Sequence, residues 1–163
     1  KSVGADRIAD CAGAFHHYGG PVLVIDFGTA TTYDYVDENG CFKAGVISVG
    51  IETGANALWS QAAQLPEIEI KKPKTILQRN TQSEMEAGIF YQYLGGVEYT
   101  IRQFMRETGR KDMKVIATGG LGRVINNHTP LIDTYDPDLI FKGLNIIYKK
   151  NKDEKKSIAR PYN

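Results

Sequence analysis

Residues 22–32, with the sequence Val22-Leu23-Val24-Ile25-Asp26-Phe27-Gly28-Thr29-Ala30-Thr31-Thr32, decide the fold of this chain. Four consecutive branched apolar residues, bounded by turn formers, predict a buried strand over 22–26. Segment 31–36 alternates in the manner of a second strand, and Asp37-Glu38-Asn39-Gly40 predicts a turn into a third strand over 41–47. We therefore expect a three-stranded β-meander at the centre of the fold.

Helices are predicted before and after this meander in the chain. Apolar spacing predicts a helix over 5–18, which Gly19-Gly20-Pro21 ends because proline cannot continue it. A second helix is expected over 51–64, and loop or short strand over 65–73. The longest helical pattern, over 82–107, is interrupted by three glycines that close approach of another helix or a ligand would explain: Gly88, Gly95 and Gly96.

The pattern over residues 113–150 predicts strands that alternate with helices. A strand over 113–117 leads into a glycine-rich junction and a short helical segment, and a weak strand is expected over 131–133. A last helix is predicted over 138–150, with a buried face made of Ile140, Leu144, Ile147 and Tyr148. This order of elements predicts an α/β domain with a mixed sheet and flanking helices.

Composition excludes several classes of protein. The 163 residues suit one globular domain, with 42% hydrophobic and 24% charged residues, and no apolar run approaches the roughly 20 residues that span a bilayer. Cys11 and Cys41 are too few for a disulfide framework and have no zinc-ligand spacing. We expect a reducing, cytoplasmic location and no membrane partner.

Charge divides the chain into a body and a tail. The net charge is +1, but 149–160 carries a surplus of positive charge, so the rest is mildly acidic. A positive face for nucleic acid is therefore not expected. We predict one domain over 1–150 and a basic, solvated tail over 151–163. Because the chain begins at Lys1 without an initiator Met, we expect it to start partway through a longer protein.

Asp26-Phe27-Gly28-Thr29 combines residues suited to phosphate binding. Backbone N–H groups of a glycine-containing turn, supported by Thr hydroxyls, can cradle phosphate oxygens. The Asp26 carboxylate can hold a cation that offsets the phosphate charge. A plain hairpin turn is the alternative interpretation of the same residues.

Two further segments carry candidate residues. Gly119 and Gly120 would let backbone approach an adenine or ribose, although tight packing of a strand on a helix explains them as well. Asp6 opens the first helix, either as a helix-dipole partner or as a carboxylate that accepts a proton from a substrate hydroxyl, and Arg7 can pair with an anionic substrate. The chain has neither a P-loop nor a Rossmann fingerprint.

Taken together, these segments resemble the type III pantothenate kinase family of the acetate and sugar kinase, Hsc70 and actin superfamily. The resemblance covers residues 2 to about 150 and rests on six pieces in order: Gly4-Ala5-Asp6-Arg7, residues 26–32, Leu65-Pro66, Asn80-Thr81, residues 117–121 and Gly143-Leu144. It implies one ribonuclease H-like, actin-like ATPase lobe, the C-terminal lobe of a two-lobed kinase. We expect this lobe alone to be inactive.

The resemblance also implies an activity and roles for residues. The activity is ATP-dependent phosphorylation of pantothenate, the first step of coenzyme A biosynthesis, by a cytoplasmic homodimer that uses Mg²⁺ and a monovalent cation, K⁺ or NH₄⁺. Asp6 is implied as the general base and Asp26 as the ligand of the monovalent cation. The implied ATP-binding residues are Gly28, Thr29, Gly119 and Gly120, and the implied pantothenate-binding residues are Gly4, Ala5, Asp6, Arg7 and Thr81.

Departures from the family pattern keep other functions open. Val49 stands where the family usually has proline, and Gln78 and Gln92 stand where it usually has glycine. They favour a non-catalytic member that acts as a transcription accessory or binding protein. The intact Asp6, Arg7 and Asp26 favour a kinase. A kinase of the same superfamily with another small substrate is the third hypothesis.

Overall fold

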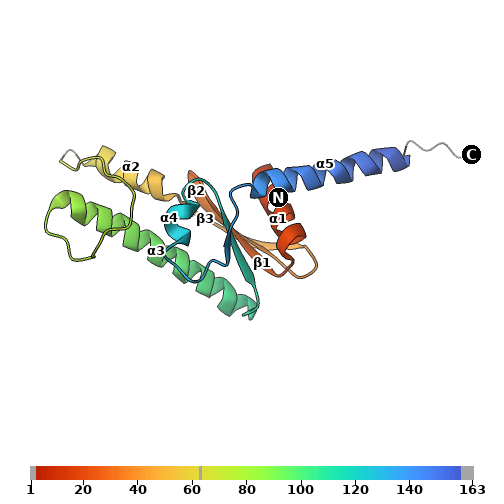
Figure 1. Ribbon diagram of the computed structural model, residues 1–163, viewed down its shortest axis with the longest axis horizontal. Helices are drawn as coiled ribbons and strands as arrows, with labels where there is room; N and C mark the ends of the chain where they lie inside the picture. The colour runs from red at the N-terminus through yellow and green to blue at the C-terminus, as the bar shows by residue number, and fades with distance from the viewer. Residues whose placement is uncertain (1–2, 63, 159–163) are drawn as a thin grey trace, which may run out of the picture.

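The protein is described by a computed structural model over residues 3–62 and 64–158 (Figure 1). The elements in chain order are α1 (Ala5–Tyr18), β1 (Val22–Phe27), β2 (Ala30–Val36), β3 (Phe42–Val49), α2 (Ile51–Gln61), α3 (Thr81–Thr108), β4 (Lys114–Thr118), α4 (Gly122–Asn126), β5 (Thr134–Tyr135) and α5 (Leu139–Ile158). The predicted α/β class and the three-stranded meander are confirmed.

One mixed sheet organises these elements. Its strand order is β3-β2-β1-β4-β5, in which β1 to β3 pair antiparallel and β1, β4 and β5 pair parallel. Because β1 is the middle strand, both of its edges are paired and both of its faces are covered. The run of branched apolar residues in 22–25 reflects this double burial.

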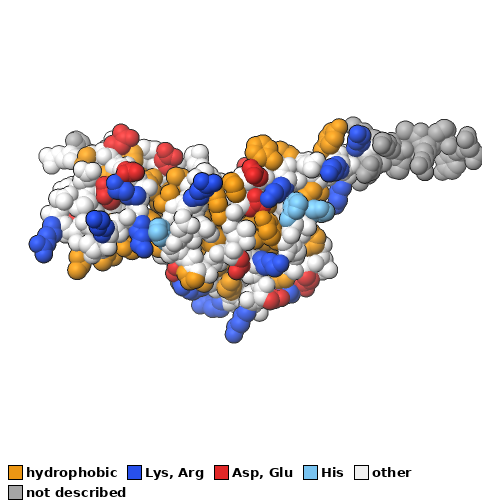
Figure 2. Space-filling view, in the orientation of Figure 1, with side chains coloured by type: hydrophobic (Ala, Val, Ile, Leu, Met, Phe, Trp, Pro, Cys, Tyr) orange, Lys and Arg blue, Asp and Glu red, His pale blue; other side chains and the backbone are white. Residues whose placement is uncertain are grey.

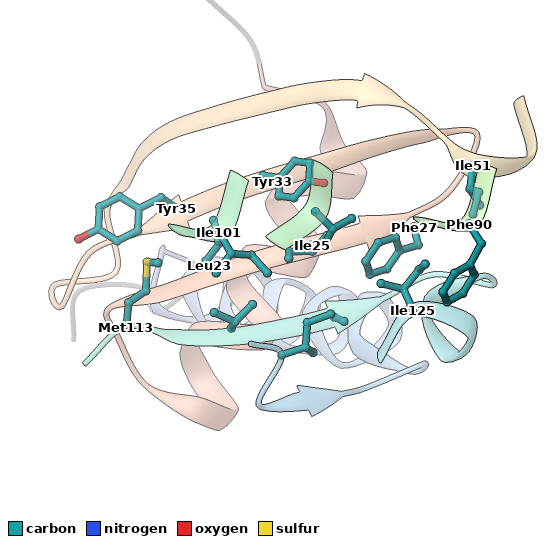
Figure 3. Packing of buried hydrophobic residues seen from close by; sticks show 14 residues of the cluster. Leu23, Ile25, Phe27, Tyr33, Tyr35, Ile51, Phe90, Ile101, Met113 and Ile125 are labelled. Carbon is teal, nitrogen blue, oxygen red and sulfur yellow. The ribbon is translucent and has the colours of Figure 1, made fainter. Parts of the chain in front are cut away.

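Successive residues of β1 enter two different cores. Leu23, Ile25 and Phe27 belong to the larger core, on the face covered by α3 and α4. Figure 3 shows Phe27 beside Phe90 and Ile125 in this core. On the opposite face Val22 and Val24 pack in a smaller core with residues of α1 and α5: Cys11, Ala14 and Leu139. The alternation therefore puts Asp26 on the α1 face.

Helices α1 and α5 touch backbone to backbone on the right of the sheet in Figure 1. A Cβ on Gly143 would collide with the backbone of Ala9, and one on Gly13 would come 2.7 Å from the Leu139 carbonyl oxygen. The glycines therefore let α5 pack closely against α1 through Gly143 and Leu139, and Leu139 is fully buried.

The buried face predicted for the last helix is wrong. Leu144 is 50% exposed and Tyr148 is 65% exposed, because the close contact through Gly143 turns these larger side chains away from the sheet. Ile140 and Ile147, the other two residues of that predicted face, are partly buried.

Several predicted boundaries shift. The weak strand expected over 131–133 is wrong: the strand lies at Thr134–Tyr135, where the chain pairs with Ile116 and Ala117. The last helix continues past Lys150 to Ile158. Of the basic tail predicted over 151–163, residues 159–163 lie outside the described residues, and the division of the chain at residue 150 remains a prediction.

The helices of the described residues are all too short or too polar to cross a bilayer.

Candidate active site

Asp26 lies at the carboxyl end of β1, in the middle of the sheet. It pairs in register with Thr32 of β2 and Thr118 of β4. Residues in register share a face, so one carboxylate and two Thr side chains form a row on the α1 face. The row marks the edge of the sheet at which the parallel strands β1 and β4 end.

Two glycine-containing turns meet at this carboxylate. A Cβ on Gly28, in the β1–β2 turn, would lie 3.8 Å from Asp26 Oδ2. A Cβ on Gly119, after β4, would collide with Asp26 Oδ1 and come 2.6 Å from the backbone N and O of Phe27. The turns predicted to cradle nucleotide phosphates and to approach a nucleoside therefore adjoin the same acid.

The turn at Gly119 is held in place from its far side. Gly119 has a φ of +89°, a conformation that favours glycine, and its carbonyl oxygen accepts a hydrogen bond of 2.9 Å from Tyr135 Oη. In the described part of the chain, nothing lies within 4 Å of a Cβ placed on Gly120. Backbone at 120 is thus open to a ligand, whereas backbone at 119 is packed against the chain.

The β1–β2 turn is anchored as well. The Thr29 carbonyl oxygen accepts hydrogen bonds from Gly50 N at 3.0 Å and from Thr53 Oγ1 at 2.8 Å. Thr29 itself is exposed. The anchoring therefore uses the backbone of Thr29 and leaves its side chain at the surface, as a phosphate contact requires.

Helix α1 brings its first turn to this end of the sheet. A short turn joins α1 to β1, so the two elements run in opposite directions and the start of α1 lies over the end of β1. Gly4 is the N-cap, Ala5 is the first helical residue, and both are exposed. Asp6 is also exposed, and its Oδ1 accepts a hydrogen bond of 2.9 Å from Arg7 N. Its second carboxylate oxygen stays available to a substrate.

Arg7 is held by an acid of the sheet. Its guanidinium donates to both carboxylate oxygens of Asp34, with Nε 3.1 Å from each, and it also lies 5.8 Å from the ring centroid of Phe42. Hydrogen bonding to Asp34 raises the pKa of Arg7. The Asp34 side chain is nearly fully buried, so this pair ties the first turn of α1 to β2.

Asp10 is a buried acid one helical turn after Asp6. It is 3% exposed, and its Oδ1 has no hydrogen-bond partner among the described residues. Burial, and then the charges of Asp26, Asp6 and Asp34, raise the pKa of Asp10 to about 7. Burial and the charges of Asp6 and Asp34 raise the pKa of Asp26 as well. The site thus has a surplus of negative charge.

These residues suit a loosely held cation. Carboxylate, hydroxyl and carbonyl oxygens are ligands for hard cations, and Asp26 supplies a carboxylate that forms no ion pair among the described residues. Within the part of the chain that is described, no three His, Cys, Asp or Glu side chains are grouped as a metal cage. A monovalent cation, or Mg²⁺ that keeps water and binds ATP phosphates, fits such a site.

Thr81 lies elsewhere. It begins α3 at the far left of Figure 1, on the other face of the sheet from α1. There it lines a pocket of 360 Å³ together with Leu65, Met85 and Ile89. Two of the sequence segments that carry the family resemblance, at 65–66 and 80–81, therefore meet at this pocket. The structure does not bring Thr81 together with Asp6 within one chain.

A second pocket, of 390 Å³, lies between α2 and α3 on the face of the sheet opposite to Asp26. Its lining is mainly apolar and includes Tyr33, Val49, Leu58, Ile89, Tyr93 and Gly96. Val49 and Leu58 are substantially exposed. This part of the surface is suited to an apolar partner and not to phosphate.

Sequence reasoning missed Asp10 and Asp34. Each had a detectable signal: Asp10 follows Asp6 by four residues, which puts both on one helix face, and Asp34 occupies an alternate position of β2 on the side of Thr32. Neither position stands out without the neighbouring element, because helix and strand become partners only in the folded chain.

The chain is similar to known proteins along most of its length. Residues 1–103 match the family model described as type III pantothenate kinase. The type III pantothenate kinase of Bifidobacterium longum (strain NCC 2705) is 63% identical over 151 residues, which are 93% of this chain and 59% of that protein. That of Agathobacter rectalis is 57% identical over 150 residues, 92% of this chain and 58% of that protein. The chain thus spans about three fifths of these relatives.

Solved structures share the fold. A protein from Campylobacter jejuni, described as a Baf family transcriptional activator, matches with a TM-score of 0.64 at 25% identity, over 94% of this chain and 67% of that one. The activator of 2-hydroxyisocaproyl-CoA dehydratase from Clostridium difficile, solved with bound ADPNP, matches with a TM-score of 0.59 at 9% identity, over 97% and 70%. The predicted actin-like ATPase fold is confirmed.

Proposed function

The chain belongs to the type III pantothenate kinase family, and we propose that the whole protein transfers the γ-phosphoryl group of ATP to the primary hydroxyl of pantothenate. The product is 4'-phosphopantothenate, and the reaction is the first step of coenzyme A biosynthesis. The observation that carries the proposal is the meeting of Asp6, Asp26 and Gly119 at one end of the sheet.

Asp6 acts on the acceptor hydroxyl. The hydroxyl oxygen bonds to the γ-phosphorus, the bond from that phosphorus to the β–γ bridging oxygen breaks, and the hydroxyl proton passes to Asp6. Because the transition state of phosphoryl transfer is loose, orienting the hydroxyl contributes more than ionising it. The exposed position of Asp6 in the first turn of α1 gives a substrate access to its free oxygen.

The two turns hold ATP on either side of Asp26. Gly28 and Thr29 contact the phosphates, and the open backbone at Gly120 faces the nucleoside, while Gly119 supports the turn from within. When bound, Mg²⁺ neutralises charge on the phosphates, and a monovalent cation, K⁺ or NH₄⁺, is held by Asp26. The surplus of acid around Asp26 is what such cations would offset.

Pantothenate binds beside the first turn of α1, along Gly4, Ala5 and Asp6. Arg7 contributes as the residue that fixes this turn to Asp34, with its guanidinium bordering the same space. We propose a cytoplasmic location for the reaction.

A homodimer would reconcile the two separate groups of pantothenate-binding residues. Asp6 begins α1 and Thr81 begins α3, and these helices cover opposite faces of the sheet (Figure 1), so we propose that a second copy supplies Thr81 if both residues touch one substrate. Helix α3 is our candidate for part of the contact, because Cβ atoms on Gly88, Gly95 and Gly96 would meet nothing within 4 Å among the described residues. Such open backbone allows another helix to approach closely.

The proposal is tested with the full-length protein in a coupled assay containing ATP, Mg²⁺, K⁺ and pantothenate. Asp6→Asn should lower kcat by about 10²- to 10⁴-fold, the range for removing a general base, while pantothenate affinity stays within about threefold. Glu52→Gln, which changes an exposed acid in the first turn of α2, is the matched control and should keep full turnover. Unchanged kcat in Asp6→Asn would remove Asp6 from the base role.

The same assay separates the other hypotheses. Saturable pantothenate binding with no turnover in the wild type would favour a non-catalytic member. Turnover of ATP with another alcohol, and no binding of pantothenate, would favour a different kinase of the superfamily. The alternative as a transcription accessory is not favoured, because the family model and the curated relatives are both described as type III pantothenate kinases.

A further inference from the structure

We propose that Asp10 is a second carboxylate of the cation site, lying across from Asp26 in the space between α1 and β1. The inference rests on the cation site of the proposed function and adds a ligand to it. Asp10 would act through one oxygen, directly or through an ordered water, on the same cation that Asp26 holds.

The geometry follows from how α1 crosses β1. Cys11 and Ala14 pack with Val24 in the smaller core, which fixes where this part of the helix lies over the strand. Asp10 lies four residues before Ala14, about 6 Å back along the helix, and Asp26 lies two residues after Val24, about 6.6 Å along β1. The two steps lead in the same direction, since helix and strand are antiparallel. They bring Asp10 opposite Asp26.

Among the described residues, no Lys or Arg forms an ion pair with Asp10 or Asp26. Arg7 is engaged by Asp34, and Lys142 of α5 pairs with Asp136, so among the described residues neither of these cations forms an ion pair with Asp10. The titratable groups that affect Asp10 are the acids Asp26, Asp6 and Asp34. Thr32 and Thr118 complete the surroundings of Asp26 without charge.

The unpartnered oxygen points to a ligand. A buried polar atom without a hydrogen bond is costly, and folded proteins nearly always satisfy such atoms. Asp10 Oδ1 is buried and has no partner among the described residues. A cation or its bound water would supply the missing partner, and it would also relieve the repulsion between the carboxylates of Asp10 and Asp26.

Cation binding without substrates tests this directly. Thermal unfolding of the full-length protein is followed in rising KCl, with N-methylglucamine chloride keeping the ionic strength constant. The wild-type Tm should rise with K⁺. In Asp10→Asn the Tm without K⁺ should equal or exceed that of the wild type, because one repelling charge is gone. The K⁺ concentration at half-maximal response should rise about tenfold or more.

Two further variants serve as positive and negative controls. Asp26→Asn should lose the K⁺ response in the same way, and Asp112→Asn, an exposed acid paired with Arg110, should keep the wild-type response. Line broadening of ²⁰⁵Tl⁺, a K⁺ substitute observable by NMR, measures binding independently of unfolding. If Asp10→Asn fails to fold, Asp10→Ser carries the same expectation in both measurements.

The possible outcomes distinguish the role of Asp10, the cation site and the proposed function. A wild-type K⁺ midpoint in Asp10→Asn, together with its loss in Asp26→Asn, would overturn the role of Asp10 and leave the cation site standing. No response to K⁺ or Tl⁺ in the wild type would overturn the role and the cation site together. A wild type that binds K⁺ through both acids but does not phosphorylate pantothenate would refute the proposed function alone.

Discussion

Gly119 packs directly against Asp26, so closely that a Cβ at position 119 would collide with the Asp26 carboxylate. The positive φ of Gly119 and the hydrogen bond from Tyr135 Oη hold that turn in position. The end of β1 and the junction after β4 therefore behave as one unit.

Substituting alanine at the two glycines of this turn should give different results. Gly119→Ala should lower the free energy of unfolding by about 1–3 kcal/mol, because φ is positive and the new Cβ meets Phe27 backbone at 2.6 Å. Gly120→Ala should leave stability within about 0.5 kcal/mol, since open space surrounds it. Urea unfolding measures both. Equal losses at 119 and 120 would contradict the packing described.

The pair formed by Arg7 and Asp34 should be important for stability. Arg7→Ala leaves a buried carboxylate without its partner and should cost about 3 kcal/mol. Arg102→Ala removes an exposed pair with Glu98 on α3 and should cost less than about 0.5 kcal/mol. Denaturant unfolding of the two variants makes the comparison. Equal and small effects would mean that Arg7 is free for substrate and does not anchor α1.

Stability should depend on pH through Asp10 when K⁺ is absent. The folded pKa of about 7 lies above the ordinary value of 3.8, so the folded state keeps a proton that the unfolded state has lost. The contribution of Asp10 to stability is therefore greatest at low pH and falls as pH rises from about 4 to 7, by at most about 1.4 kcal/mol per pH unit.

Asp10→Asn isolates this effect. The free energy of unfolding of the wild type minus that of Asp10→Asn should fall across this pH range and stay level above pH 7. A difference that does not change with pH would show that Asp10 has an ordinary pKa.

Substitutions at the glycines of α3 test the proposed dimer. Gly95→Ala should stabilise an isolated chain by about 1 kcal/mol, because the glycine lies inside a helix with open space around it. If a second copy packs there, the same change should weaken self-association measured by sedimentation. Asn145→Ala, at an exposed position of α5 on the other face of the sheet, serves as the control. Unaltered association in Gly95→Ala would exclude this part of α3 from the contact.

The sequence predicted the elements well wherever one periodicity dominated. The helix over 5–18 is confirmed residue by residue, and the meander follows from the run 22–25 and the turn at 37–40. Which face of α5 is buried could not be predicted. Its large apolar residues suggested a buried side, but Gly143 determines the packing because it admits the backbone of Ala9. A pattern of hydrophobicity carries no information about such close approaches.

The candidate site was predictable in parts. Asp26, Gly28 and Gly119 were recognisable from strand-and-turn chemistry, and the fold brings them together. Asp10 and Asp34 were missed because their importance depends on which element covers which face. A lone acid in a helix suggests a solvated position, and only the packing of α1 on β1 reveals that Asp10 is buried.

The division of β1 between two cores has a consequence for changes in chain length. Inserting or deleting one residue inside this strand would exchange its faces, turning the carboxylate towards Phe90 and a phenyl ring towards α1. A change of two residues would restore the face but displace the acid by about 6.6 Å from Gly119. Lengthening is therefore tolerable only in irregular segments such as 66–79, where no helix or strand register has to be preserved.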